Sequence, residues 1–150
     1  MSKISPLAFI DPEAKIGENC EIGPFCFIDK NVEIGDNNVL MNSVSVLYGA
    51  RIGNGNVIFP GAVISAVPQD LKFRGEDTTA EVGDNNKIRE NVTINRGTAA
   101  KGKTCVGSGN LLMESVHVAH DAFVGNDCII GNGTKLAGEI IIDDHAIISA

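Results

Sequence analysis

The sequence repeats with a period of six residues, and this repeat constrains the fold more than any other feature. Starting at Ile4, every sixth residue is Ile, Leu or Val at 22 of the 25 positions up to Ile148; we call these residues anchors. The three residue types supply 38 of the 150 residues, so chance would give about six matches. The exceptions are Asp70, Glu76 and Ala100. A period of six excludes an amphipathic helix, whose apolar face recurs every 3.6 residues.

The neighbours of the anchors repeat as well. Two positions before most anchors stands a small or β-branched residue, such as Cys20, Val44 or Ala62. Residues i and i−2 of a strand share a face, so we expect both to point into one core. The position after the anchor is often Gly, as at Gly53 and Gly83. Gly is typical of a sharp turn, and we therefore expect these glycines to form the corners.

Short strands separated by corners predict an all-β solenoid in which three hexads close one triangular coil. The composition agrees, with 17 Gly and only 7 aromatic residues (6 Phe, 1 Tyr, no Trp) among 150. A narrow prism has room for aliphatic and small side chains but for few rings. We expect one domain over residues 1–150.

Two interruptions preserve the phase of the repeat. Ile64 and Val82 are 18 residues apart, and Ile94 and Val106 are 12 apart. We therefore expect two loops that leave the coil near residues 65–81 and 95–105. Residues 72–103 hold 7 of the 12 basic residues, which fits either an anionic ligand or a solvated face.

Charge and cysteine usage exclude several classes of protein. The formal net charge of −7 argues against a surface that binds nucleic acid throughout. No apolar run approaches the ~20 residues that span a bilayer, and the N-terminus has no secretory signal. Cys20, Cys26, Cys105 and Cys128 form no CxxC pair, so we expect reduced thiols packed as small hydrophobic residues.

The three histidines are His117, His120 and His145. His117 is adjacent to an anchor and His120 lies at a corner, so both point out of the prism. Two readings stay open: His120 is a general base, with an ordinary pKa near 6.5 that suits proton abstraction at neutral pH, or the histidines bind zinc between subunits.

Several motifs together resemble the acyl-carrier-protein-dependent UDP-N-acetylglucosamine O-acyltransferases of lipid A biosynthesis, a hexapeptide-repeat family. The motifs that carry the resemblance are Pro68-Gln69-Asp70-Leu71-Lys72, Thr93-Ile94-Asn95-Arg96-Gly97-Thr98, Asn110-Leu111-Leu112-Met113, His117-Val118-Ala119-His120-Asp121 and Leu136-Ala137-Gly138. The resemblance implies a left-handed parallel β-helix, although parallel crossovers are generally right-handed.

The resemblance also implies a reaction, in which a 3-hydroxyacyl chain passes from acyl carrier protein to the 3-hydroxyl of UDP-N-acetylglucosamine. It implies that His120 is the general base, that Asp121 assists it, and that the Gly138 N–H stabilises the oxyanion. The residues that it implies bind substrate are Gln69, Asp70, Lys72, Met113 and His117. No metal or cofactor is implied, and the expected assembly is a cytoplasmic homotrimer with no membrane-spanning segment.

The chain departs from the family pattern at three places. Glu139 stands where a His is common, and Asn95 stands where another His is common. Family members also continue beyond the position of Ala150 with further coils and a helical C-terminal domain, so we expect these parts to be absent here. A related acyltransferase with an N-acyl product or a coenzyme A donor, and a non-catalytic solenoid, remain alternatives.

Overall fold

The computed structural model describes all 150 residues and contains 22 short strands and no helix. The strands form three parallel sheets. The first sheet contains β1 (Lys3–Ile4), β4 (Glu21–Ile22), β7 (Val39–Leu40), β10 (Val57–Ile58), β13 (Lys87–Ile88), β16 (Leu111–Leu112), β19 (Ile129–Ile130) and β22 (Ile147–Ile148). The second contains β2 (Phe9–Ile10), β5 (Phe27–Ile28), β8 (Ser45–Val46), β11 (Val63–Ala66), β14 (Thr93–Asn95), β17 (His117–Val118) and β20 (Lys135–Leu136). The third contains β3 (Lys15–Ile16), β6 (Glu33–Ile34), β9 (Ala50–Ile52), β12 (Thr79–Val82), β15 (Lys103–Val106), β18 (Phe123–Val124) and β21 (Ile141–Ile142).

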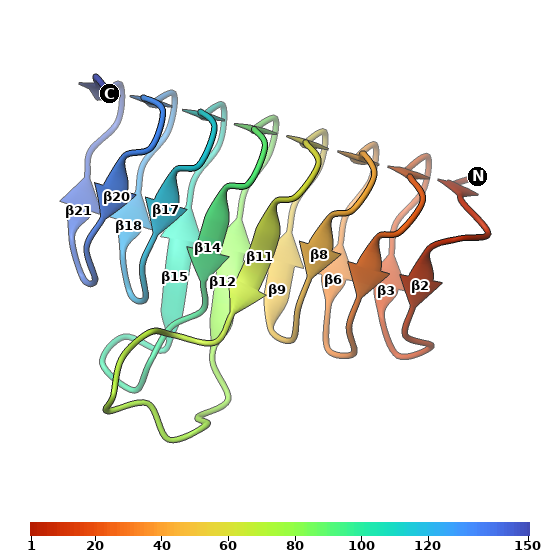
Figure 1. Ribbon diagram of the computed structural model, residues 1–150, viewed down its shortest axis with the longest axis horizontal. Helices are drawn as coiled ribbons and strands as arrows, with labels where there is room; N and C mark the ends of the chain where they lie inside the picture. Colours follow the sequence, from red (N-terminus) through yellow and green to blue (C-terminus); the bar gives the residue numbers. More distant parts are fainter.

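Successive strands belong to successive sheets, so the chain winds as a left-handed parallel β-helix with three flat faces. Figure 1 shows the coils stacked in sequence order, with the two termini at opposite ends. Each strand pairs with the strand one coil away, and outside the loops the register is 18 residues, as in Lys3 with Glu21. The predicted fold class is therefore confirmed.

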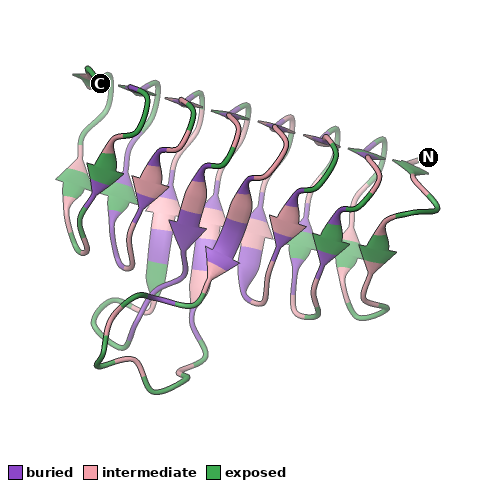
Figure 2. Cartoon of the chain, in the orientation of Figure 1, coloured by how far each residue is buried: buried purple, intermediate pink, exposed green.

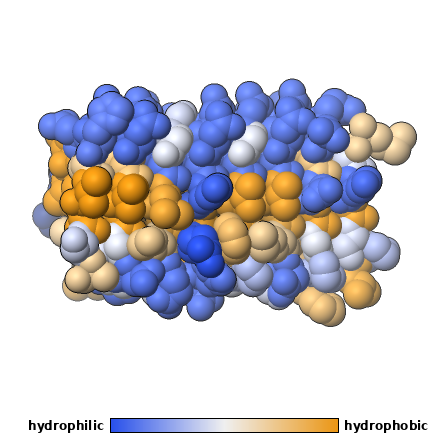
Figure 3. All heavy atoms as spheres, turned by 90° about the horizontal axis from the view of Figure 1, so that it is seen from above, coloured by the Kyte–Doolittle hydropathy of each residue, from blue (hydrophilic) through white to orange (hydrophobic).

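Every strand contains one anchor, and the anchors fill the axis of the prism. The core consists of 28 buried hydrophobic residues, and Figure 2 shows that the buried positions run through the middle coils. The residue before each anchor points outward, because alternate residues of a strand face opposite sides. In the first sheet the outward residues include Val39, Val57, Leu111, Ile129 and Ile147, which form much of the apolar stripe in Figure 3.

The glycines after the anchors have a different role from the one that the sequence predicts. None of them has a positive φ; that conformation falls two residues later, at residues such as Asn37 and Gly55. A Cβ on Gly53 would instead lie 2.7 Å from the carbonyl oxygen of Gly83 in the next coil. Close approach between stacked coils, and not a turn, therefore requires Gly at this position.

A column of buried asparagines crosses the middle coils at the position two before the anchor. It consists of Asn38, Asn56, Asn86 and Asn110, all at most 2% exposed. The Oδ1 of Asn56 accepts hydrogen bonds from the backbone N–H and the side-chain amide of Asn86, at 2.9 and 3.0 Å. Each of these side chains thereby ties its coil to the next.

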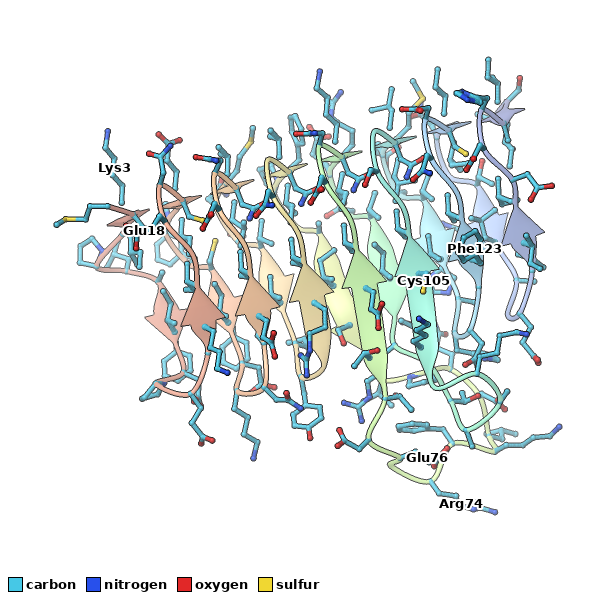
Figure 4. All side chains as sticks on the ribbon, turned by 180° about the vertical axis from the view of Figure 1, so that it is seen from behind. Lys3, Glu18, Arg74, Glu76, Cys105 and Phe123 are labelled. Carbon is cyan, nitrogen blue, oxygen red and sulfur yellow. The ribbon has the colours of Figure 1, made fainter.

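All four cysteines are free thiols. Cys20, Cys26 and Cys128 are buried in the core, as predicted. Cys105 differs, because it is adjacent to an anchor and faces outward. Figure 4 shows Cys105 and Phe123 on the outer face of the third sheet, where they are paired neighbours.

The two loops leave the coil at one corner, between the second and third sheets (Figure 1). Residues 67–78 connect β11 to β12, and residues 96–102 connect β14 to β15. Both loops are shorter than the expected spans 65–81 and 95–105, because the flanking strands extend into them. Across them the register becomes 30 and 24 residues, as in Val57 with Lys87 and Lys87 with Leu111. The structure contains no apolar helix of membrane-spanning length.

Candidate functional site

The candidate site lies at the corner from which the loops leave. The chain turns this corner once more between β17 and β18, and His120 lies on that turn. A groove of about 520 Å³ opens beside it. Its lining comes from both loops' neighbours and from two later coils: Gln69, Thr93, Asn95, His117, Ala119, His120, Lys135 and Gly138. The fold thus brings His117, His120, Gly138 and Gln69 to one surface, although 69 positions separate the first and last of these residues.

His120 is held by the carboxylate that follows it. Its Nδ1 lies 2.8 Å from Oδ2 of Asp121, and its side chain is 17% exposed. Because a carboxylate only accepts hydrogen bonds, Nδ1 carries the proton and Nε2 keeps its lone pair. Nε2 lies 3.8 Å from Oδ2 of Asp70, which is too long for a hydrogen bond. The imidazole is therefore oriented with its basic nitrogen free.

Asp121 is buried and surrounded by donors. Its carboxylate accepts hydrogen bonds from the backbone N–H and hydroxyl of Thr98 and from the N–H of Lys101. Burial by itself would raise the pKa of the Asp121 carboxyl, but the hydrogen bonds from Thr98, His120 and Lys101 together hold that pKa below its usual value. Asp121 is thus a fixed negative charge behind His120, and the 96–102 loop supplies most of its donors.

Gly138 lies against the imidazole from the next coil. A Cβ at this position would be 2.6 Å from Nε2 and 2.7 Å from Cε1 of His120. Only Gly therefore leaves the ring where it is. The N–H of Gly138 donates no hydrogen bond, so one unpaired donor stands beside Nε2.

His117 occupies the floor of the groove on β17. Its Nδ1 is 2.7 Å from the hydroxyl oxygen of Thr93, its partner in the neighbouring strand. Burial, and to a smaller extent the positive charge of Lys135, lower the pKa of His117. A neutral imidazole with one ring nitrogen unused can bind a polar ligand in the groove.

The 67–78 loop brings Gln69 and Asp70 toward His120 and leaves Lys72 outside the groove. Gln69 lines the groove, and Asp70 faces Nε2 of His120 as described above. The Lys72 side chain is exposed, although its backbone N–H donates to Oδ1 of Asp70 at 3.0 Å. The proposed substrate-binding loop is therefore split between a part inside the site and a part in solvent; Figure 4 shows its far end at Arg74 and Glu76.

Buried contacts hold the two loops in place. The Arg96 guanidinium lies 5.1 Å from the Tyr48 ring centroid and 5.3 Å from the Phe73 ring centroid, and Arg96 is 8% exposed. The Tyr48 hydroxyl donates to Oδ1 of Asp77 at 2.9 Å. Thr78 in the first loop donates from its hydroxyl to the carbonyl of Gly97 in the second. The loops therefore form one layer over the corner.

Two residues singled out from the sequence lie elsewhere. Met113 follows β16, at the corner between the first and second sheets, and does not line the groove. His145 is exposed at the corner between β21 and β22. No group of three or more His, Cys, Asp or Glu side chains is arranged to hold a metal ion.

The sequence analysis missed Thr93, Asn95, Thr98 and Lys135 as members of the site. The repeat contains the signal for two of them, because counting one coil from His117 leads to Thr93 on one side and Lys135 on the other. It contains no signal for Thr98, whose contact with Asp121 depends on the shape of a loop.

Solved structures of similar proteins have the same fold. The UDP-N-acetylglucosamine acyltransferase of Bacteroides fragilis 9343 is 75% identical over 97% of this chain, with a TM-score of 0.97. The enzyme of Francisella novicida is 44% identical over 98% of the chain with a TM-score of 0.96, and that of Arabidopsis is 31% identical over 98% with a TM-score of 0.81. The chain spans 57%, 54% and 59% of these three proteins. No protein-family model matches the chain.

Proposed function

We propose that this chain, which belongs to the family of UDP-N-acetylglucosamine acyltransferases, carries the catalytic centre of an enzyme that transfers a 3-hydroxyacyl group from acyl carrier protein to the 3-hydroxyl of UDP-N-acetylglucosamine. The observation that carries the proposal is the His120–Asp121 pair beside the unpaired N–H of Gly138. A base and an oxyanion donor at adjacent points are what acyl transfer to a hydroxyl requires.

His120 acts as the general base in this proposal. Nε2 accepts the proton of the sugar hydroxyl while the hydroxyl oxygen attacks the carbonyl carbon of the thioester. The resulting oxyanion accepts a hydrogen bond from the Gly138 N–H. When the C–S bond breaks, the imidazolium returns its proton to the departing thiolate, so no net charge or proton is gained by the enzyme. Asp121 stabilises the transient imidazolium through Nδ1, in the same manner as the carboxylate of a catalytic triad.

Substrate binding is assigned to groups around that centre. Gln69 and the unused ring nitrogen of His117 contact the sugar nucleotide from inside the groove, and Asp70 contacts the sugar hydroxyl beside Nε2. Lys72 binds the diphosphate from the solvent side, as a positive charge on a flexible stem can. Met113 contacts the acyl chain or a second subunit, because it lies at a different corner from His120.

The proposed assembly is a cytoplasmic trimer with the grooves between subunits. An outward-facing catalytic histidine on a convex prism supports this arrangement, because a single convex surface cannot enclose a substrate. A cyclic trimer would bring the face of a neighbouring prism to each groove.

The test is acyl transfer by the protein at its natural length, with UDP-N-acetylglucosamine and a 3-hydroxyacyl carrier protein. His120→Ala should lower kcat by about 10³-fold, because proton transfer from the hydroxyl loses its acceptor. His145→Ala, an exposed histidine at another corner, is the matched control and should retain wild-type activity. Substantial activity in the His120 variant would exclude His120 as the base, and preference for an acyl-coenzyme A donor would exclude the proposed donor.

A further inference from the structure

Asn95 is a buried amide at the wall of the groove that lacks a hydrogen-bond partner. It ends β14 and is 3% exposed. Its Oδ1 is fully buried and accepts no hydrogen bond. Buried polar atoms in folded proteins are nearly always paired, so this exception calls for a ligand or another explanation.

The local structure explains why the protein itself supplies no partner. Alternation along β14 places Asn95 on the outer face with Thr93, away from the core. Its neighbour in the previous coil is Ala66, and the position beside it in the next coil is Ala119, which follows the Val118 that pairs with Ile94. Two alanine side chains flank the amide, and neither can form a hydrogen bond with it.

The other buried asparagines show that this chain can pair such side chains. Asn56 and Asn86, in the column inside the prism, each bond to the coils before and after them. Asn95 is therefore distinguished by its place, since it faces the groove that also contains His117 and His120. An unpaired carboxamide in a groove is a binding group for a ligand that carries both a donor and an acceptor.

The proposed reaction places such a ligand group within reach. The inference rests on the proposed function, in which His120 removes the proton of the sugar 3-hydroxyl. The acetamido group of N-acetylglucosamine is on the adjacent carbon, and it offers one N–H and one carbonyl oxygen. A carboxamide can accept from the first and donate to the second. Rotation about the Cβ–Cγ bond of Asn95 turns either end of its amide toward the groove.

We propose that Asn95 recognises the acetamido group of the acceptor sugar and sets the preference for an N-acetylated substrate. A site built to pair a buried polar group discriminates strongly against substrates that cannot pair with it. The residue is a specificity determinant, and the proton transfer at His120 does not depend on it.

The experiment compares UDP-N-acetylglucosamine with UDP-glucose, which has a hydroxyl in place of the acetamido group, for the natural-length protein and for Asn95→Ala. Binding of each sugar nucleotide is measured by calorimetry without an acyl donor, and kcat/KM is measured with one. The wild type should prefer UDP-N-acetylglucosamine. In the variant that preference should fall by about 10-fold or more through weaker binding of the acetylated sugar, while kcat at saturation changes by less than about threefold.

Equal losses for both sugars, or an unchanged preference, would overturn the inference. So would a wild type that binds both sugars equally or neither. Normal discrimination in binding without any acyl transfer would instead sink the proposed function and leave the role of Asn95 standing.

Two further variants separate recognition from folding. Asn42→Ala, at an exposed corner, should leave the preference unchanged. Asn95→Asp keeps the shape and an acceptor but loses the donor, so it should also weaken binding of the acetylated sugar while its melting temperature stays near that of the wild type. An Asp variant that binds UDP-N-acetylglucosamine like the wild type would show that the amide donor is not used.

Discussion

At the scale of single residues, the site depends on what surrounds His120. Asp121 fixes one ring nitrogen, and the missing side chain of Gly138 leaves space for the other. Both constraints act on orientation, and acyl transfer is sensitive to displacements as small as ~1 Å.

Gly138→Ala should therefore lower kcat/KM by about 100-fold. The added methyl group would lie 2.6 Å from Nε2 of His120, and the ring must turn away from its present place. The backbone of Gly138 does not require a positive φ, so the melting temperature should change little. Steady-state kinetics and thermal unfolding measured on the same preparation check this, and full activity would show that the ring has room that the geometry denies.

The ionisation of His117 gives a second test at this scale. Burial first, and then the charge of Lys135, lower the pKa of His117, so NMR titration should show it below the ordinary value of about 6.5. Lys135→Gln should move the pKa upward without restoring the ordinary value, because burial is the larger cause. Since the lowered pKa disfavours the charged folded form, this residue's contribution to stability is complete above about pH 6.5 and declines as the pH falls toward the folded-state pKa. An unchanged His117 pKa in the variant would contradict the assigned influence of Lys135.

At the scale of elements, the stacked coils are joined by side chains as well as by strand pairing. The asparagine column continues at both ends in cysteines: the thiols of Cys20 and Cys128 donate to the carbonyls of Gly35 and Asp143, at 3.2 and 3.1 Å. A thiol can therefore take over one of the two roles of an asparagine in this column. The role that it cannot take over is to accept hydrogen bonds from the next coil.

Asn56→Leu should lower the free energy of unfolding by about 1–3 kcal/mol, because it leaves the N–H of Asn86 and the carbonyl of Gly83 buried without partners. Asn56→Cys should cost less, since its S–H can still donate to Gly83, which now accepts from Asn56 Nδ2 at 2.9 Å. Urea unfolding of the two variants gives the comparison. If the Leu variant equals or exceeds the Cys variant in stability, then the hydrogen bonds of the column contribute less than the packing of its side chains.

At the scale of the whole molecule, each coil contacts only its neighbours, so stability is expected to vary along the prism. Ile4 in the first coil is 45% exposed, whereas Ile28 and Ile58 are fully buried. The loop layer lies over the middle coils, where it adds contacts that the first coil lacks.

In a chain of these 150 residues, hydrogen exchange should be about tenfold or more faster for the amides of β1–β3 than for those of β10–β14, because terminal coils can open without disrupting the core. Hydrogen–deuterium exchange followed by mass spectrometry resolves the two regions. Uniform protection would show that the prism opens only as one cooperative unit.

The sequence alone determined the prism. Its period sets which residue faces inward, so the 22 anchors predict the 22 strands, and motifs at fixed places on the coil led to His120, Asp121, Gly138 and His117. Counting by whole coils would also have found Thr93 and Lys135, because stacked coils repeat with a constant register.

Only the tertiary structure decided what the non-periodic parts do. The loops have no repeat, and their course depends on contacts between distant residues, such as Arg96 with Tyr48 and Phe73. That course supplies the Thr98 hydrogen bonds to Asp121, places Gln69 in the groove and leaves Lys72 in solvent. It also buries the Asn95 amide between two alanines without a partner. Periodicity encodes position within a coil, whereas these features arise from packing across coils that the period does not specify.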